Sequence, residues 1–157
     1  MNTMKNNQRG FTLIELLVVI AIIALLSTLA VFSLNSARQK SRDAKRLADV
    51  KQVQTALELY YDDQRGYPVS DLLLGPTGDP PVAMCLLNSG FDFGGNCNNG
   101  DPVVYMGFVP GDPGNLQYRY VGTLDDYEIR FQLEGPTAGL PGETPLCAST
   151  SGLTICP

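Results

Sequence analysis

The feature that most constrains this chain is one ionisable side chain inside a long apolar run. Residues 13–26 are all apolar except Glu15, and apolar side chains remain frequent up to Leu34. A helix over residues 11–34 would be about 36 Å long at ~1.5 Å per residue, which is enough to cross a hydrocarbon layer of ~30 Å. A carboxylate without a partner is costly in lipid, so we expect Glu15 to have a cationic partner.

The residues around this carboxylate form the motif Gly10-Phe11-Thr12-Leu13-Ile14-Glu15, which follows a short basic leader. The motif resembles the class III signal of type IV prepilins and of type II secretion pseudopilins. The resemblance implies that a prepilin peptidase cleaves between Gly10 and Phe11 and that the new amine of Phe11 is N-methylated. It also implies that Glu15 pairs with the Phe11 amine of a neighbouring subunit during assembly.

An ordinary secretory signal is the alternative interpretation of the same run. Such a signal has an apolar core of about 7–15 residues followed by a cleavage site of small residues. The apolar run in this chain is longer and carries its acid inside the helix. We therefore expect residues 1–10 to be a leader peptide and residues 11–34 to be a transmembrane and polymerisation helix.

The helix is predicted to continue beyond the apolar run, because neither Pro nor Gly occurs in residues 11–65. Residues 35–65 show an amphipathic pattern, with apolar residues spaced three or four apart. These are Leu47, Val50, Val53, Leu57 and Tyr60. The polar residues Arg42, Lys45, Asp49, Gln52 and Glu58 are expected on the opposite side. Gly66 is the expected left-handed cap, and Pro68 cannot continue the helix.

Residues 66–157 are predicted to form a globular head with a loop, a β-hairpin and, after Gly135, a C-terminal tail. Residues 69–102 are rich in Gly, Pro, Asn and Asp and are expected to be a long ordered loop. Alternating apolar residues over 116–121 and 127–134 predict an antiparallel hairpin whose apolar face covers the helix. The expected fold class is therefore α+β, in which a long N-terminal helix packs on a small antiparallel sheet. Residues 57–68 and, more loosely, 105–135 also resemble pseudopilins and pilins.

The four cysteines all lie in loop-like sequence of the head. Without histidine or a Cys-x-x-Cys pair, a zinc site would need four thiolates at an unfamiliar spacing, so disulfides are the preferred interpretation. Among three possible connectivities we prefer the local one, which pairs Cys85 with Cys97 and Cys147 with Cys156. Unpaired buried cysteines remain the alternative. Disulfides indicate an oxidising compartment, so we expect the head to be extracytoplasmic.

The charge is distributed unevenly along the chain. Nine of the eleven basic residues precede Gly66, whereas ten of the sixteen acids follow it. The basic run from Arg38 to Arg46 could bind anionic lipid or DNA, but it lacks the interleaved aromatic residues of a single-strand binder. We expect instead a solvated face or salt bridges between subunits, and we do not expect nucleic acid as a partner.

No enzymatic activity, cofactor or metal is expected. The absence of histidine removes the usual general base. Two pairs of aspartates, at 62–63 and 125–126, lie at a predicted helix end and a predicted turn, where solvated aspartate is common. Asp112, Asp125, Asp126 and Glu128 could supply oxygen ligands for calcium, but no loop matches the calcium loop of the resembled family.

The predicted function is that of a structural subunit of a type IV pilus or a type II secretion pseudopilus. The subunit is expected to reside in the inner or cytoplasmic membrane as a single-pass protein and to be processed there by prepilin peptidase. It then polymerises through its helix with other copies on an inner-membrane assembly platform. The sequence alone does not separate the two kinds of filament. The alternative is a monomeric membrane-anchored binding module, which would have to tolerate Glu15 without a partner.

Overall fold

The computed structural model describes residues 11–76, 84–94, 97 and 103–157. The chain divides into two compact units, residues 1–38 and residues 39–157. Helix α1, Leu13–Gln64, is 52 residues long and contributes to both units. The predicted unbroken helix and the α+β class are therefore confirmed.

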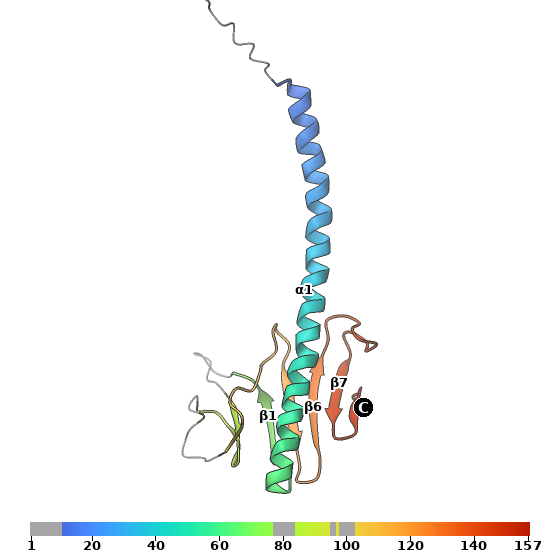
Figure 1. The fold of residues 1–157 in the computed structure, drawn as a ribbon. Coiled ribbons are helices and arrows are strands. Elements are labelled where there is room, and N and C mark those ends of the chain that lie inside the picture. The colour runs from blue at the N-terminus through green and yellow to red at the C-terminus, as the bar shows by residue number, and fades with distance from the viewer. Residues whose placement is uncertain (1–10, 77–83, 95–96, 98–102) are drawn as a thin grey trace, which may run out of the picture. The chain divides into compact units, whose positions relative to one another are not determined.

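The second unit is built around a five-stranded antiparallel sheet with strand order β1-β5-β6-β7-β8. Its strands are β1 Ser70–Leu74, β5 Tyr118–Gly122, β6 Tyr127–Gln132, β7 Pro145–Ser149 and β8 Gly152–Ile155. Figure 1 shows the last part of α1 lying across one face of this sheet. Strands β5 and β6 are the predicted hairpin, with Tyr120 opposite Ile129.

A second antiparallel sheet has the strand order β3-β2-β4, from β2 Cys85–Leu87, β3 Gly90–Asp92 and β4 Val104–Met106. The prediction of one long loop over residues 69–102 is therefore wrong where β1, β2 and β3 form. Strands β2 and β3 have only three residues each, too few to show an alternating pattern among glycines and asparagines. The parts of that range at 77–83, 95–96 and 98–102 lie outside the described residues.

The region after Gly135, expected to be a tail, instead adds strands β7 and β8 to the edge of the main sheet. Phe131 lies opposite Leu146, and Ile129 lies opposite Ala148. All four side chains are buried, so the apolar face of the hairpin extends onto β7. Repeated glycine, proline and threonine around these short strands conceal them in the sequence.

One apolar core joins α1 to both sheets. The predicted helix residues Val50, Val53, Leu57 and Tyr60 are all buried in it. The two sheets contribute the following buried residues to the same cluster: Leu74, Leu86, Tyr118, Tyr120, Tyr127, Ile129, Phe131, Leu146 and Ala148. Edge-to-face ring contacts from Tyr60 to Tyr105 and from Phe91 to Tyr120 add aromatic packing between the elements. The predicted packing of the hairpin on the helix is confirmed.

The end of α1 differs from the prediction. Arg65, and not Gly66, adopts the left-handed conformation, with φ of 60°. The Arg65 amide donates to the Tyr61 carbonyl at 2.8 Å, which closes the last helical turn. Gly66 follows in an ordinary conformation, close to the hairpin turn: a Cβ placed there would lie 3.2 Å from Leu124 Cδ2. The Tyr67 amide then donates to the Leu124 carbonyl at 3.0 Å.

This helix end predicts different effects of substitution at two adjacent residues. Arg65→Gly should raise the free energy of unfolding by about 0.5–1 kcal/mol, because glycine adopts positive φ without a steric penalty. Gly66→Ala should change it by less than about 0.5 kcal/mol, because only the movable end of Leu124 crowds the added methyl group. The measurement is thermal and denaturant unfolding of the full chain in detergent. A large loss for Gly66→Ala, with no gain for Arg65→Gly, would instead favour the cap expected from sequence.

Candidate assembly site

The apolar part of α1 presents its side chains outward within the first unit. Every described side chain from residue 11 to residue 38 is exposed, and Phe11 is 88% exposed. Among the described residues, α1 is the one helix whose length and composition would allow it to cross a membrane. Such a large apolar surface must be covered by lipid or by other protein chains.

Glu15 lies at the beginning of this helix and closes a capping box with Thr12. The backbone amide and the hydroxyl of Thr12 donate to Glu15 Oε2 at 2.8 and 2.7 Å, and the Glu15 amide donates back to the Thr12 hydroxyl at 3.3 Å. This pattern satisfies amide groups that the first helical turn leaves without partners. Among the described residues, both hydrogen bonds accepted by this carboxylate use Oε2, which leaves Oε1 able to accept from a further donor.

The capping box was missed in the sequence reasoning, although Thr12-x-x-Glu15 is its usual signature. Its effect is to turn the Glu15 carboxylate toward the N-terminal end of the helix. That end carries Phe11, the residue on which cleavage is expected, from the sequence motif, to create an amine. Gly10 and the rest of residues 1–10 lie outside the described residues.

In the second unit, α1 carries a buried guanidinium that holds two loops. Arg46 is 0% exposed. Its Nε donates to Asp112 Oδ2 at 2.6 Å, and its Nη1 pairs with Asp43 at 2.7 Å and with Glu134 at 2.8 Å. Arg42 forms a bidentate contact with the same Glu134, donating from Nε and Nη2 to its two carboxylate oxygens. We call these five residues the Arg46 cluster.

The carboxylates of the Arg46 cluster also bind backbone amides. Asp43 accepts from the amides of Glu134 and Gly135 at 2.8 and 3.0 Å. Asp112 accepts from the amides of Gly114 and Leu116 at 2.7 and 3.2 Å. The cluster thereby fastens the segment after β6 and the loop before β5 to α1. Each buried charge is both paired and hydrogen-bonded, as burial of ions requires.

The prediction that this part of α1 presents a solvated polar face is therefore wrong for several residues. Arg42 and Arg46 bind within the unit, and Asp49, which is only 6% exposed, accepts a hydrogen bond from the Tyr118 hydroxyl at 3.3 Å. Burial raises the pKa of the Asp49 carboxyl. Lys45 remains exposed, as the prediction had it. Charge alone could not reveal which basic residues have acidic partners distant in sequence.

The Arg46 cluster makes the fold sensitive to acid. The hydrogen bond from Arg42, followed by that from Arg46, lowers the pKa of Glu134 from 4.5 to about 2. A carboxyl whose pKa is lower in the folded state stabilises that state above its ordinary pKa. This contribution is present above about pH 4.5 and is lost as the pH falls toward about 2.

The two disulfides of the structure join Cys85 to Cys97 and Cys147 to Cys156. This is the local connectivity preferred from the sequence. Cys147 and Cys156 link β7 to the end of β8, and the Cys156 amide also donates to the Pro145 carbonyl at 3.0 Å. Cys85 begins β2, so the other bridge ties that strand to residue 97. One bridge thus joins the last two strands of the main sheet, and the other ties the central strand of the second sheet to residue 97.

Several acidic residues that could suggest chemistry have structural partners. Asp126 accepts from its neighbouring amide, that of Tyr127, and from the Thr150 hydroxyl at 2.7 Å, and its own amide donates to Thr123 Oγ1. Asp63 accepts from the Tyr105 hydroxyl at 3.0 Å, and Glu128 pairs with Arg130. Among the described residues, no group of three or more His, Cys, Asp or Glu side chains is placed to hold a metal.

Removal of the central cation tests the Arg46 cluster. Arg46→Met should lower the free energy of unfolding at pH 7 by roughly 3–5 kcal/mol, because the buried carboxylates would lose their counter-charge. Arg42→Met is the matched control, and it should cost only about 0–1 kcal/mol because Arg42 is partly exposed. The loss in each variant should shrink as the pH falls from about 4.5 toward about 2, because both arginines lower the pKa of Glu134, and circular dichroism follows the unfolding. Equal, pH-independent losses in the two variants would contradict this account.

The comparisons with known proteins agree with the motif. The family described as "Prokaryotic N-terminal methylation motif" matches residues 5–31. Type II secretion system core protein G of Dickeya chrysanthemi is 36% identical over 138 residues, covering 88% of this chain and 83% of that protein. The protein of the same name from Aeromonas hydrophila is 34% identical over 138 residues, with 85% and 90% covered.

A third relative, type II secretion system core protein G of Pectobacterium carotovorum subsp. carotovorum, is 36% identical over 145 residues, covering 86% of this chain and 80% of the relative. No solved structure gives a significant match. The similarity to these relatives extends over most of both chains and includes the apolar helix and the head. On this similarity, the chain belongs to the family of type II secretion system core protein G.

Proposed function

We propose that this protein is the structural subunit of a type II secretion pseudopilus, anchored in the membrane by α1 and polymerised through it. The observation that carries the proposal is the capped carboxylate of Glu15 at the head of a helix whose apolar side chains are all exposed up to residue 38. Membership of the core protein G family favours a pseudopilus over an adhesive pilus. The disulfide-stapled head suits an extracytoplasmic compartment.

Processing supplies the cation that the carboxylate needs. Prepilin peptidase cuts after Gly10, and the amine that this creates on Phe11 is N-methylated and remains positively charged. Glu15 Oε1 then accepts from the Phe11 amine of a neighbouring subunit, while Oε2 keeps its bonds to Thr12. Pairing in lipid is strongly favoured, because each charge alone would be buried without compensation. Each subunit that joins the filament thereby neutralises the buried charges of Glu15 and the Phe11 amine in the same step.

The first expected outcome concerns processing. Gly10→Leu should leave residues 1–10 attached and keep the subunit out of filaments, because no amine forms on Phe11. Gln8→Leu, a change to the same side chain in the same leader, should be processed normally. Intact-mass spectrometry of membrane and filament fractions distinguishes the forms. Filament subunits that begin at Met1 in the wild type would overturn the proposal.

The second expected outcome concerns the charge of Glu15. Glu15→Gln keeps the capping box, because glutamine can also close it, but removes the negative charge. The ratio of Glu15→Gln subunits to wild-type subunits should be at least about tenfold lower in filaments than in the membrane. The reason is that the Phe11 amine of the neighbouring subunit would be buried without its carboxylate, which costs several kcal/mol. The two subunits carry different tags, are co-expressed, and are counted in sheared filaments and membranes.

Thr12→Val is the matched control for that experiment. It removes the hydroxyl from the capping box and weakens the first helical turn by about 1 kcal/mol, yet it leaves the carboxylate charged. It should therefore enter filaments at close to its membrane ratio. If Glu15→Gln enters filaments as well as the wild type, the carboxylate does not drive assembly, and a monomeric membrane-anchored module becomes the better interpretation.

A further inference from the structure

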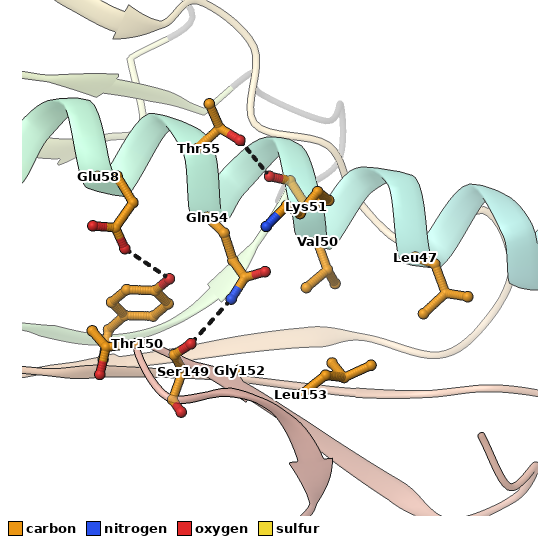
Figure 2. A pocket seen from close by; sticks show the side chains of 11 residues that line it. Leu47, Val50, Lys51, Gln54, Thr55, Glu58, Ser149, Thr150, Gly152 and Leu153 are labelled. Atoms are coloured by element: carbon orange, nitrogen blue, oxygen red, sulfur yellow. Dashed lines mark hydrogen bonds between the residues drawn. The ribbon is translucent and has the colours of Figure 1, made fainter. Parts of the chain in front are cut away.

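An uncovered groove of about 460 Å³ lies in the second unit between α1 and the turn that joins β7 to β8. Figure 2 shows its two walls, with Leu47 and Val50 projecting from α1 toward Leu153 of β8 at one end. Glu58 and Thr150 lie at the other end. The groove is thus apolar at one end and polar at the other.

The polar end is closed by bonds within the unit. Gln54 Nε2 donates to the Ser149 carbonyl at 3.2 Å, and the Tyr127 hydroxyl donates to Glu58 Oε1 at 3.4 Å. These bonds bridge the helix and the sheet, so few polar groups there need a further partner. The apolar end has no such closure among the described residues.

The sheet face at the apolar end extends beyond the helix that should cover it. Leu153 and Ile155 of β8 lie opposite Ala148 and Leu146 of β7, and residues directly opposite each other share a face. Ala148 and Leu146 are completely buried, whereas Leu153 is 38% and Ile155 is 58% exposed. The core-facing side of the sheet therefore ends in apolar side chains that the described residues leave uncovered.

Lys51 supplies a positive charge on the wall of this groove. It is exposed, and none of the ion pairs between described residues includes it. A ligand for the apolar end should therefore present an apolar side chain next to a carboxylate.

The turn between β5 and β6 presents such a pair on the same chain. Leu124 is 65% exposed, more than any other leucine described in residues 39–157, and Asp125 beside it is exposed and has no ion pair among the described residues. The turn is held firmly, because the Thr123 amide donates to the Asp126 carbonyl at 2.8 Å and the Leu124 carbonyl accepts from the Tyr67 amide. A rigid turn loses little conformational entropy on binding.

We propose that the groove binds the β5–β6 turn of a second copy of this chain, with Leu124 against Leu47, Val50 and Leu153, and Asp125 paired with Lys51. The turn and the groove are different surfaces, so the contact is heterologous and can repeat without closing, as a helical filament requires. The inference rests on the proposed pseudopilus function and adds to it a contact between heads.

Two charge reversals test the contact. Lys51→Glu alone and Asp125→Lys alone should each lower the fraction of subunits in filaments by roughly threefold to tenfold, because each reversal places like charges together in every contact. Co-expression of the two variants with different tags should restore assembly into mixed filaments. When the two variants alternate in a filament, the groove of a Lys51→Glu subunit binds the turn of an Asp125→Lys subunit, so the two reversed charges meet. At the next contact, the unchanged Lys51 of the second variant meets the unchanged Asp125 of the first. Every contact in that order is therefore attractive.

Matched controls separate the contact from general effects of charge and folding. Lys40→Glu and Asp62→Lys reverse exposed charges outside the groove and the turn, and both should assemble as the wild type does. Leu124→Ser should lower assembly, whereas Leu59→Ser, at another exposed leucine, should not. Melting of each full-length variant in detergent, and the mass of its mature form, confirm that folding and processing are unchanged.

The outcomes are distinct. Normal assembly of both Lys51→Glu and Asp125→Lys would overturn the inference. Impaired single variants that do not rescue each other when mixed would also overturn it, because the contact would then not lie between copies. Wild-type subunits that are processed but form no filament at all would instead refute the proposed function, and this inference with it.

Discussion

The organisation of the second unit depends on one buried cation. Arg46 meets Asp43, Asp112 and Glu134 at a place where the helix, the loop before β5 and the segment after β6 come together. Apolar packing specifies that the sheet lies on the helix, but it acts without direction. Guanidinium bonds have fixed directions and lengths, so they specify how the loops are attached.

Helix α1 has two different surfaces in one continuous element. Residues 11–38 expose their side chains on all sides, and most of these are apolar, whereas the following turns bury one side against the sheets. An all-apolar helix is stable only in lipid or among other chains, and an amphipathic one needs a single covering surface. Under the proposed function, the same helix serves both for anchoring and polymerisation and as a support for the head. Glu15 would serve the first role, whereas the Arg46 cluster holds the head together.

Sequence reasoning worked where a pattern was long and local. The helix is predicted by dozens of residues without a breaker, and the β5–β6 hairpin by two strands of alternating apolar residues around a turn. It failed at short strands such as β2, whose three residues carry no periodicity, and at the helix end, where glycine suggested the cap that Arg65 forms. It also placed Arg42, Arg46 and Asp49 on an outward side of the helix, because their partners Glu134, Asp112 and Tyr118 lie 66 to 92 residues away in the chain.

The sequence by itself determined the membrane-length helix, the motif around Glu15, the α+β class and the family. These properties follow from local composition and from the spacing of residues along one element, which the chain carries in any conformation. Only the tertiary structure decided that Arg46 is buried, that the head contains two sheets, and that β8 leaves apolar side chains uncovered beside α1. These features arise from contacts between residues far apart in sequence, and such contacts exist only after the chain has folded.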